Sequence, residues 1–258
     1  MISSLPLGLE DDAAVPPRAS CDAPGGFVET PAPVSVEVHA VEPLSANCAL
    51  LESALEGAGF RRVGTGRWRK ADGEAAATVV VHRLALGAER RAEALFPALA
   101  GGEEVGSVCG DDGCEDAAFE GHYDGSGGPR YESVAVETLD GLLAGLGVAD
   151  AVDFLALDVE GHDPNVLAGG RKTVAGARFL EFEYHYRGAW AADSLRRHVA
   201  LLETDGYDCY LEGAHSALWR LSNGCFDAAF EFRDWSNVAC VRRDEPAWHA
   251  MLQKYAVV

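Results

Sequence analysis

The sequence lacks any long uninterrupted hydrophobic run. No window approaches the roughly 18 apolar residues that a membrane-spanning helix needs, so we expect no transmembrane segment. The first residues also lack a basic region and turn acidic early, at Glu10, Asp11 and Asp12, which is unlike a secretory or transit peptide. Together these absences predict a cytoplasmic protein.

Positive charge is scarce. The 258 residues include 21 Lys and Arg against 41 Asp and Glu, which gives a formal net charge of -20. A surface of this sign repels phosphate backbones and anionic lipid heads, so we predict no nucleic-acid partner and no membrane partner. The hydrophobic share of 48% and the charged share of 24% are typical of globular proteins, and the chain can bury a sizeable core.

The cysteines lack a recognisable spacing. There are seven, and the closest pair, Cys109 and Cys114, has no second cysteine pair or histidine pair nearby to complete a zinc site. An odd number of scattered cysteines favours reduced thiols over a disulfide framework.

Prolines and glycines divide the chain. Residues 1–33 contain Pro16-Pro17 and Gly25-Gly26 without sustained periodicity, so we predict an irregular arm there and a folded domain over 34–258. Residues 101–128 hold nine glycines and little apolar content, which predicts a flexible surface excursion.

Hydrophobic periodicity predicts alternating strands and helices in the rest of the chain. The expected strands are 34–41, 78–86, 131–137, 152–159, 179–184, 207–211, 217–221 and 238–242, and the expected helices are 46–58, 138–146, 195–204 and 246–255. This alternation indicates an α/β fold with a doubly wound, mostly parallel sheet. The run 152–159 is almost entirely apolar, which is typical of a central strand buried on both faces.

Two strand ends carry candidate ligand-binding residues, because ligands of open α/β sheets bind beyond the carboxyl ends of the strands. Glu42 follows the first strand, and its two carboxylate oxygens match the spacing of a ribose diol. The alternative is an ordinary surface glutamate before a turn. The small residues Ala85-Leu86-Gly87 would let the backbone approach a flat ring, although a plain strand–turn junction is the preferred explanation for this fragment alone.

A third strand end carries two carboxylates. Asp158 and Glu160 point the same way on a period of two, so they could orient a hydroxyl, take its proton, or hold an aminium or metal charge. Alternatively they cap the next helix. With Asp163 they would suit magnesium or calcium, but chance clustering in so acidic a chain is the preferred explanation, and we assign no metal site. His185 is a candidate base, against the alternative of a packing residue.

In this order, the fragments resemble the FkbM family of methyltransferases. The matching fragments are His39-Ala40-Val41-Glu42-Pro43, Ala85-Leu86-Gly87, Glu137-Thr138-Leu139-Asp140, Asp153 to Asp163, Leu180 to Tyr184, Gly206 to Tyr210, and Trp235 to Cys240. The resemblance covers roughly residues 35–243. It implies a Rossmann-like class I methyltransferase fold and transfer of a methyl group from S-adenosylmethionine to a hydroxyl of a small molecule or glycan.

The resemblance also assigns roles by position. Glu42 would bind the ribose of S-adenosylmethionine, and the turn formed by Ala85, Leu86 and Gly87 would border its adenine. Asp158 and Glu160 would line the methyl-transfer site, with His185 as the candidate base.

One part of the family pattern is absent. The family carries a strand and a glycine-rich loop before the ribose-binding acid, whereas the residues before Val36 hold Pro16-Pro17 and no apolar strand. We therefore expect a fold incomplete at its N-terminus and weak cofactor binding. A non-catalytic binding module on the same scaffold is the main alternative. A nicotinamide-dependent oxidoreductase is weaker, since Gly-x-Gly-x-x-Gly is equally absent.

Overall fold

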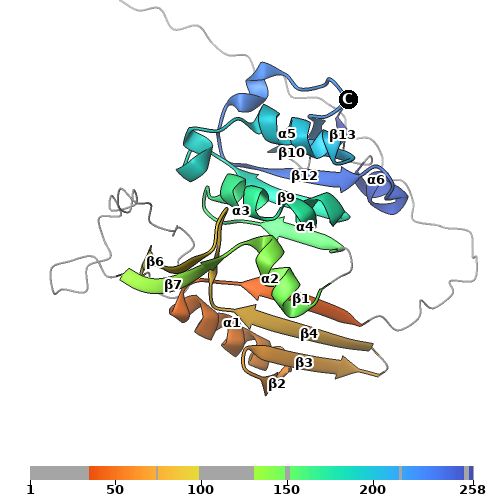
Figure 1. The fold of residues 1–258 in the computed structure, drawn as a ribbon. Helices are drawn as coiled ribbons and strands as arrows, with labels where there is room; N and C mark the ends of the chain where they lie inside the picture. Colours follow the sequence, from red (N-terminus) through yellow and green to blue (C-terminus); the bar gives the residue numbers. More distant parts are fainter. Residues whose placement is uncertain are drawn as a thin grey trace, which may run out of the picture. The chain divides into compact units, whose positions relative to one another are not determined.

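The fold is that of a computed structural model, which describes residues 35–73, 75–98, 131–148, 152–214, 217–252 and 256–257 (Figure 1). These residues belong to one compact unit, Ser35–Val258. The predicted arm 1–33 and the predicted excursion 101–128 lie outside the described residues. None of the described helices is long and apolar enough to cross a membrane.

A four-stranded sheet begins the unit. Its strands, in spatial order, are β1 (Val36–Val41), β4 (Ala75–His82), β3 (Arg67–Asp72) and β2 (Arg61–Gly64). Strand β1 runs parallel to β4, whereas β3 is antiparallel to both of its neighbours. Helix α1 (Ser45–Gly57) follows β1. The hairpin β2–β3 was not predicted, because its many arginines and glycines mask the alternation that usually identifies a strand.

A three-stranded sheet in the order β5-β7-β6 follows. Its strands are β5 (Ala85–Leu86), β7 (Tyr131–Glu137) and β6 (Arg91–Pro97). The side chain of Thr138 accepts a hydrogen bond from the Gly141 N–H and so caps α2 (Leu139–Leu146), the helix predicted at 138–146. Asp140 accepts hydrogen bonds from the backbone N–H groups of Lys172 and Thr173 at the start of α4 (Arg171–Gly176). Within this run, Thr138 therefore caps α2 and Asp140 caps the start of α4.

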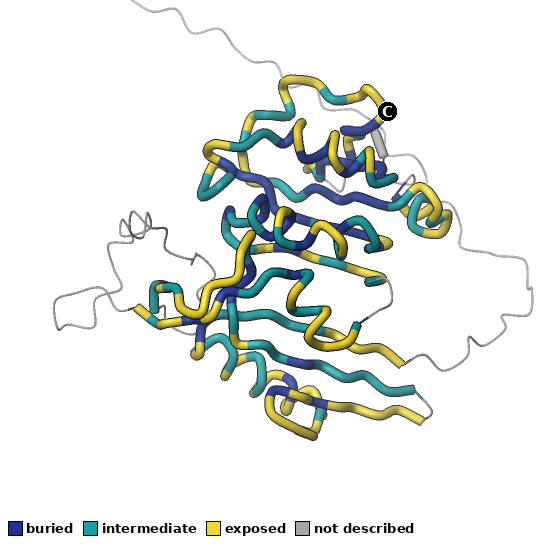
Figure 2. The backbone as a smooth tube through the Cα atoms, viewed as in Figure 1, coloured by how far each residue is buried: buried dark blue, intermediate teal, exposed yellow. Residues whose placement is uncertain are grey.

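The six-stranded sheet contains most of the buried core. Its order is β13 (Ala256–Val257), β11 (Leu218–Arg220), β10 (Tyr207–Glu212), β12 (Ser236–Arg242), β9 (Phe179–Tyr184) and β8 (Phe154–Leu157). The accompanying helices are α3 (Asp163–Gly169), α5 (Leu195–Thr204), α6 (Pro246–Leu252), η2 (Gly188–Ala191) and η4 (Ala228–Glu231). Figure 2 shows burial concentrated in β9, β10 and β12, while β2 and β3 are largely exposed.

The α/β class is confirmed, but the doubly wound, mostly parallel arrangement is not. All three sheets are mixed, and β12 runs antiparallel to both β9 and β10. Strand β8 was predicted to be central and buried on both faces; instead it lies at the edge of its sheet, and Phe154 is 51% exposed. An apolar run indicates a buried strand in general, but it carries no information on how many neighbours pair with it.

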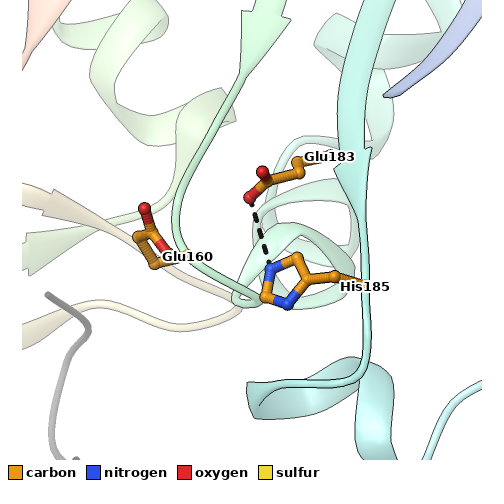
Figure 3. A group of neighbouring side chains, drawn as sticks. All are labelled: Glu160, Glu183 and His185. Atoms are coloured by element: carbon orange, nitrogen blue, oxygen red, sulfur yellow. Dashed lines mark ion pairs between the residues drawn. The ribbon is translucent and has the colours of Figure 1, made fainter. Parts of the chain in front are cut away.

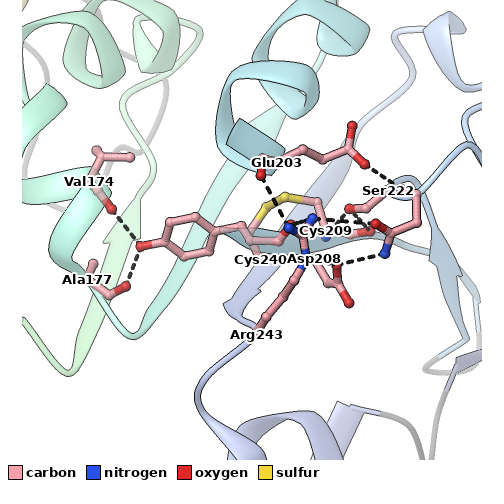
Figure 4. The surroundings of a disulfide bond; sticks show 10 residues. Val174, Ala177, Glu203, Asp208, Cys209, Ser222, Cys240 and Arg243 are labelled. Carbon is pink, nitrogen blue, oxygen red and sulfur yellow. Dashed lines mark hydrogen bonds and ion pairs between the residues drawn. A yellow bond between two sulfur atoms is a disulfide. The ribbon is translucent and has the colours of Figure 1, made fainter. Parts of the chain in front are cut away.

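The expectation of reduced thiols is wrong for one pair of cysteines. Cys209 and Cys240 form a buried disulfide (Figure 4). They lie directly opposite each other on β10 and β12, so strand register brings together two residues that are 31 positions apart in the chain. Among the described residues, Cys48 and Cys225 remain free thiols.

Candidate functional site

The predicted acidic strand end lies beside the end of a second strand. Strands β8 and β9 are parallel neighbours, with Leu157 opposite Phe182, so their carboxyl ends meet at one edge of the sheet. Figure 3 shows Glu160 in the loop after β8, and Glu183 and His185 at the end of β9. One side-chain ligand atom from each of these three residues lies within 4.8 Å of the others. We call Glu160, Glu183 and His185 the acidic–histidine cluster.

Close backbone contact holds Glu160 in this position. Glu160 has a positive φ of 53°, which is uncommon for a residue with a side chain, and Gly161 follows at 87°. The Gly161 carbonyl accepts a hydrogen bond of 2.9 Å from the Ala189 N–H. A Cβ atom on Gly161 would lie 2.6 Å from the Arg187 carbonyl oxygen. The loop after β8 is therefore docked against the segment after β9, and this contact fixes the backbone of Glu160.

Replacing Gly161 with alanine tests this docking. The new Cβ meets the Arg187 carbonyl and also disfavours the positive φ, so we expect G161A to lower the free energy of unfolding by about 1–3 kcal/mol. Chemical denaturation measures the change. Gly176 is the matched control, because a Cβ there meets nothing within 4 Å, and G176A should be neutral or slightly stabilising. Equal stability of G161A and the parent chain would contradict the docking.

Within the cluster, Glu183 and His185 form a buried pair. Glu183 Oε2 lies 3.3 Å from His185 Nε2, and the His185 side chain is fully buried. The indole N–H of Trp235 donates to the other Glu183 oxygen, and the Trp235 ring stacks on His185 with centroids 4.5 Å apart. Burial alone would raise the pKa of Glu183, but these hydrogen bonds outweigh it and lower that pKa. Glu183 is therefore the ionised member of the cluster.

The tautomer of His185 follows from its second nitrogen. The backbone N–H of Arg187 donates to His185 Nδ1 over 3.1 Å. A backbone N–H can only donate, so Nδ1 must carry a lone pair, and the neutral ring carries its proton on Nε2, facing Glu183. Histidines that bind a metal through Nε2 almost always donate a proton from Nδ1. The cluster has the spacing of a metal site, but this tautomer does not fit one.

A metal-binding experiment tests this assignment. Because His185 Nε2 carries a proton, we expect the chain, after exhaustive treatment with EDTA and gel filtration, to take up no stoichiometric Mg²⁺, Mn²⁺ or Zn²⁺. Equilibrium dialysis followed by elemental analysis measures the bound metal. Stoichiometric binding of one of these ions that is lost when His185 is replaced would contradict the tautomer assignment.

Two other carboxyl groups at this edge have strongly raised pKa values. Burial, together with the charges of Glu183 and Asp158, raises the pKa of Glu160 to about 7. Burial likewise raises the pKa of Asp163 to about 8, even though its Oδ1 accepts a hydrogen bond from the Glu183 N–H. One oxygen of each group is buried and has no hydrogen-bond partner among the described residues. Near neutral pH, Glu160 can therefore both accept and release a proton.

The candidate ribose-binding residue also lies at a strand end. Glu42 follows β1, and its backbone N–H bonds to the His82 carbonyl at the end of β4. Its Oε1 accepts a hydrogen bond of 2.8 Å from the Leu44 N–H, and burial raises its pKa. A half-buried carboxylate at the ligand-binding edge fits a ribose diol, although one of its oxygens is already engaged.

The predicted adenine-bordering turn is closely packed. Ala85 and Leu86 form β5 and are only 5% and 9% exposed. The carbonyl oxygen of Gly87 would lie 2.1 Å from a Cβ on Gly169, so this turn and α3 approach each other at backbone distance. In this conformation, Ala85 and Leu86 contribute mainly to the protein core.

Sequence reasoning placed some of these residues and missed others. The direct partnership of Glu183 with His185 was not predicted. Trp235 lies 50 positions beyond His185, and neither its contact with His185 nor that of Arg187 was predicted. A polar residue two positions before His185 on a strand was the available signal for Glu183. No local signal links Trp235 to the site.

Comparison with known proteins agrees with the fragments identified above. The family model for the methyltransferase FkbM domain matches residues 32–209, which is more than half of the chain. No curated protein and no solved structure gives a match. The matched range includes Glu42, Asp158, Glu160, Glu183 and His185, and ends before Trp235.

Proposed function

This chain belongs to the FkbM methyltransferase family, and from that premise we propose that it transfers a methyl group from S-adenosylmethionine to a hydroxyl oxygen of a small molecule or glycan. The observation that carries this proposal is Glu160, a carboxyl group with a pKa of about 7 at the carboxyl end of β8. A hydroxyl becomes a better nucleophile as its proton is removed, and a general base works best when its pKa is near the operating pH.

In this proposal Glu160, rather than His185, takes the proton of the acceptor hydroxyl. His185 Nδ1 accepts a hydrogen bond from the Arg187 N–H, and Nε2 lies 3.3 Å from Glu183 Oε2, within ion-pair distance. His185 is therefore a positioning residue, which keeps Glu183 ionised. Glu160 has a buried oxygen without a hydrogen-bond partner among the described residues, and that oxygen is available to receive a proton.

The charge of the site suits the donor. When bound, S-adenosylmethionine supplies a methyl group on a positively charged sulfur. Asp158 and Glu183 contribute negative charge at the same edge, as their effect on the pKa of Glu160 shows, and this favours a cationic ligand. Glu42, whose carboxylate already bonds to the Leu44 N–H and to the Asn47 side chain, would hold the ribose hydroxyls. The main contribution of these residues is to orient the two reactants and to receive the proton.

A radiolabelled methyl-transfer assay tests the proposal. The chain is incubated with S-adenosylmethionine labelled on its methyl group and with panels of hydroxylated sugars, polyketides, carboxylic acids and amines. We expect label to appear in hydroxyl acceptors and S-adenosylhomocysteine to form in equal amount. Transfer only to amines or carboxylates would overturn the assignment of a hydroxyl acceptor, and absence of any transfer would favour the second candidate function.

That second candidate is a binding module without catalysis. Burial of Ala85 and Leu86 supports it, because a turn committed to the core offers little backbone to an adenine ring. Isothermal titration calorimetry with S-adenosylmethionine and S-adenosylhomocysteine separates the two functions. Micromolar binding supports the enzyme, whereas absence of binding to either compound supports the module.

A further inference from the structure

The hairpin β2–β3 has a charge opposite to that of the chain as a whole. Residues 61–70 contain five of the 21 basic side chains and no acidic one, in a protein with a net charge of -20. The five are Arg61, Arg62, Arg67, Arg69 and Lys70. We call residues 61–70 the basic hairpin. Its charge is therefore opposite in sign to the net charge of the chain.

Three of the five basic side chains have local partners. Arg67 forms an ion pair of 2.7 Å with Glu37 on β1. Lys70 donates a hydrogen bond of 2.8 Å to the Ala58 carbonyl. The Arg62 guanidinium lies 6.0 Å from the centre of the Trp68 ring. These contacts stabilise the sheet and the end of α1, which explains why these three basic residues are present.

Arg61 and Arg69 lack such an explanation. They lie directly opposite each other on β2 and β3, so their side chains project from the same face, and both residues are exposed. Neither forms a hydrogen bond or an ion pair with another residue in the part of the chain that the structure describes. Like charges directly opposite each other on a sheet are destabilising. Arg61 and Arg69 therefore repel each other, whereas an acidic residue in place of one of them would attract the other.

The backbone beside this pair is also available. Strand β2 is the edge of the four-stranded sheet, and all four of its residues are exposed. Val63 within it is 56% exposed. An edge strand presents N–H and C=O groups that can pair with a further strand, and an extended peptide can bind in this way.

We propose that the basic hairpin is a docking surface for an acidic peptide segment, which adds to β2 as an extended strand and places carboxylates against Arg61 and Arg69. Charge complementarity selects this partner. Electrostatic interactions are screened over about 8 Å at physiological ionic strength, so a short peptide is attracted to the basic hairpin alone. A long polyanion or an anionic membrane would extend beyond the basic hairpin and be repelled by the net negative charge of the rest of the chain.

The competing explanation is that the arginines only protect an open edge from aggregation, which charged edge residues commonly do. The two explanations differ in what they predict for a peptide. Edge protection predicts that an acidic peptide does not bind and that removing the arginines promotes self-association. The docking surface is separate from Glu160 and its neighbours, so it does not depend on the proposed methyl transfer.

Fluorescence anisotropy with the full chain tests the proposal. The probe is a labelled eight-residue peptide of alternating Glu and Val, compared with the same peptide carrying Gln in place of Glu. We expect the acidic peptide to bind and R61Q/R69Q to weaken it about tenfold, the effect of losing two exposed ion pairs. The matched control is R90Q/K172Q, which removes two exposed basic side chains elsewhere and should bind as the parent chain does.

Hydrogen–deuterium exchange provides the second measurement. Strand addition should slow exchange of the β2 amides at residues 61–64 when the acidic peptide is present. Binding that is equal for R61Q/R69Q and R90Q/K172Q would overturn the proposal, as would equal binding of the Gln peptide. Weakened binding without protection of residues 61–64 would overturn the strand addition. Because R61Q/R69Q relieves a repulsive pair on the surface, its melting temperature should not fall.

Discussion

Replacing Glu160 with glutamine is expected to lower kcat for methyl transfer by about 10²–10⁴, the usual contribution of a general base. Glutamine preserves the size of the side chain but cannot accept the hydroxyl proton. Affinity for S-adenosylmethionine should change little, because Glu42 rather than Glu160 is proposed to hold the ribose. Single-turnover assays with labelled donor measure the rate, and calorimetry measures the affinity.

The same proposal fixes the pH dependence. The active form of Glu160 is the carboxylate, so kcat/KM of the parent chain should rise with pH and level off above its pKa of about 7. In E160Q this limb should be lost, and the residual rate should depend little on pH between 5 and 8. If kcat/KM of E160Q still rises with pH, a group other than Glu160 accepts the proton of the hydroxyl.

The control for E160Q is Glu212, a partly buried glutamate at the end of β10. Burial also raises its pKa, but its carboxyl group is not part of the acidic–histidine cluster. E212Q therefore removes a similar carboxyl group while leaving the proposed base in place. Methyl transfer by E212Q should match the parent chain, and an equal loss in both variants would show that the effect of E160Q is not specific.

Replacing Asp163 with asparagine is expected to raise stability by up to about 4 kcal/mol at pH 7. Asp163 is fully buried, and its pKa of about 8 shows that the native state strongly disfavours the carboxylate. Asparagine has nearly the same shape and keeps an oxygen that can accept from the Glu183 N–H. For a domain of this size, each kcal/mol gained corresponds to a melting temperature higher by about 2–4 °C.

The pH dependence of stability shows whether D163N is more stable because it removes a buried carboxyl group or because it changes packing. The native state holds the Asp163 proton up to pH 8, whereas the unfolded chain releases it near pH 4. Stability of the parent chain should therefore fall as pH rises between about 4 and 8. The advantage of D163N should disappear below pH 4 and be largest above pH 8. A stability difference between D163N and the parent chain that stays constant between about pH 4 and 8 would contradict the raised pKa of Asp163.

The sequence alone determined the local elements of this protein. Apolar periodicity identified β1, α1, β7, α2 and β9 to within a few residues, because each depends on neighbours in the chain. Asp158 and Glu160 were placed at a strand end by a run of apolar residues and a glycine. Such features are encoded within about ten residues, so they can be read without knowledge of the fold.

Only the tertiary structure decided which of these elements are neighbours. It placed β8 at an edge, paired Cys209 with Cys240, and brought Trp235 onto His185 from 50 positions away. It also decided the electrostatics, because the pKa values of Glu160 and Asp163 depend on burial and on Glu183, which lies on another strand. Strand order and burial result from the packing of the whole domain, and no local pattern specifies them.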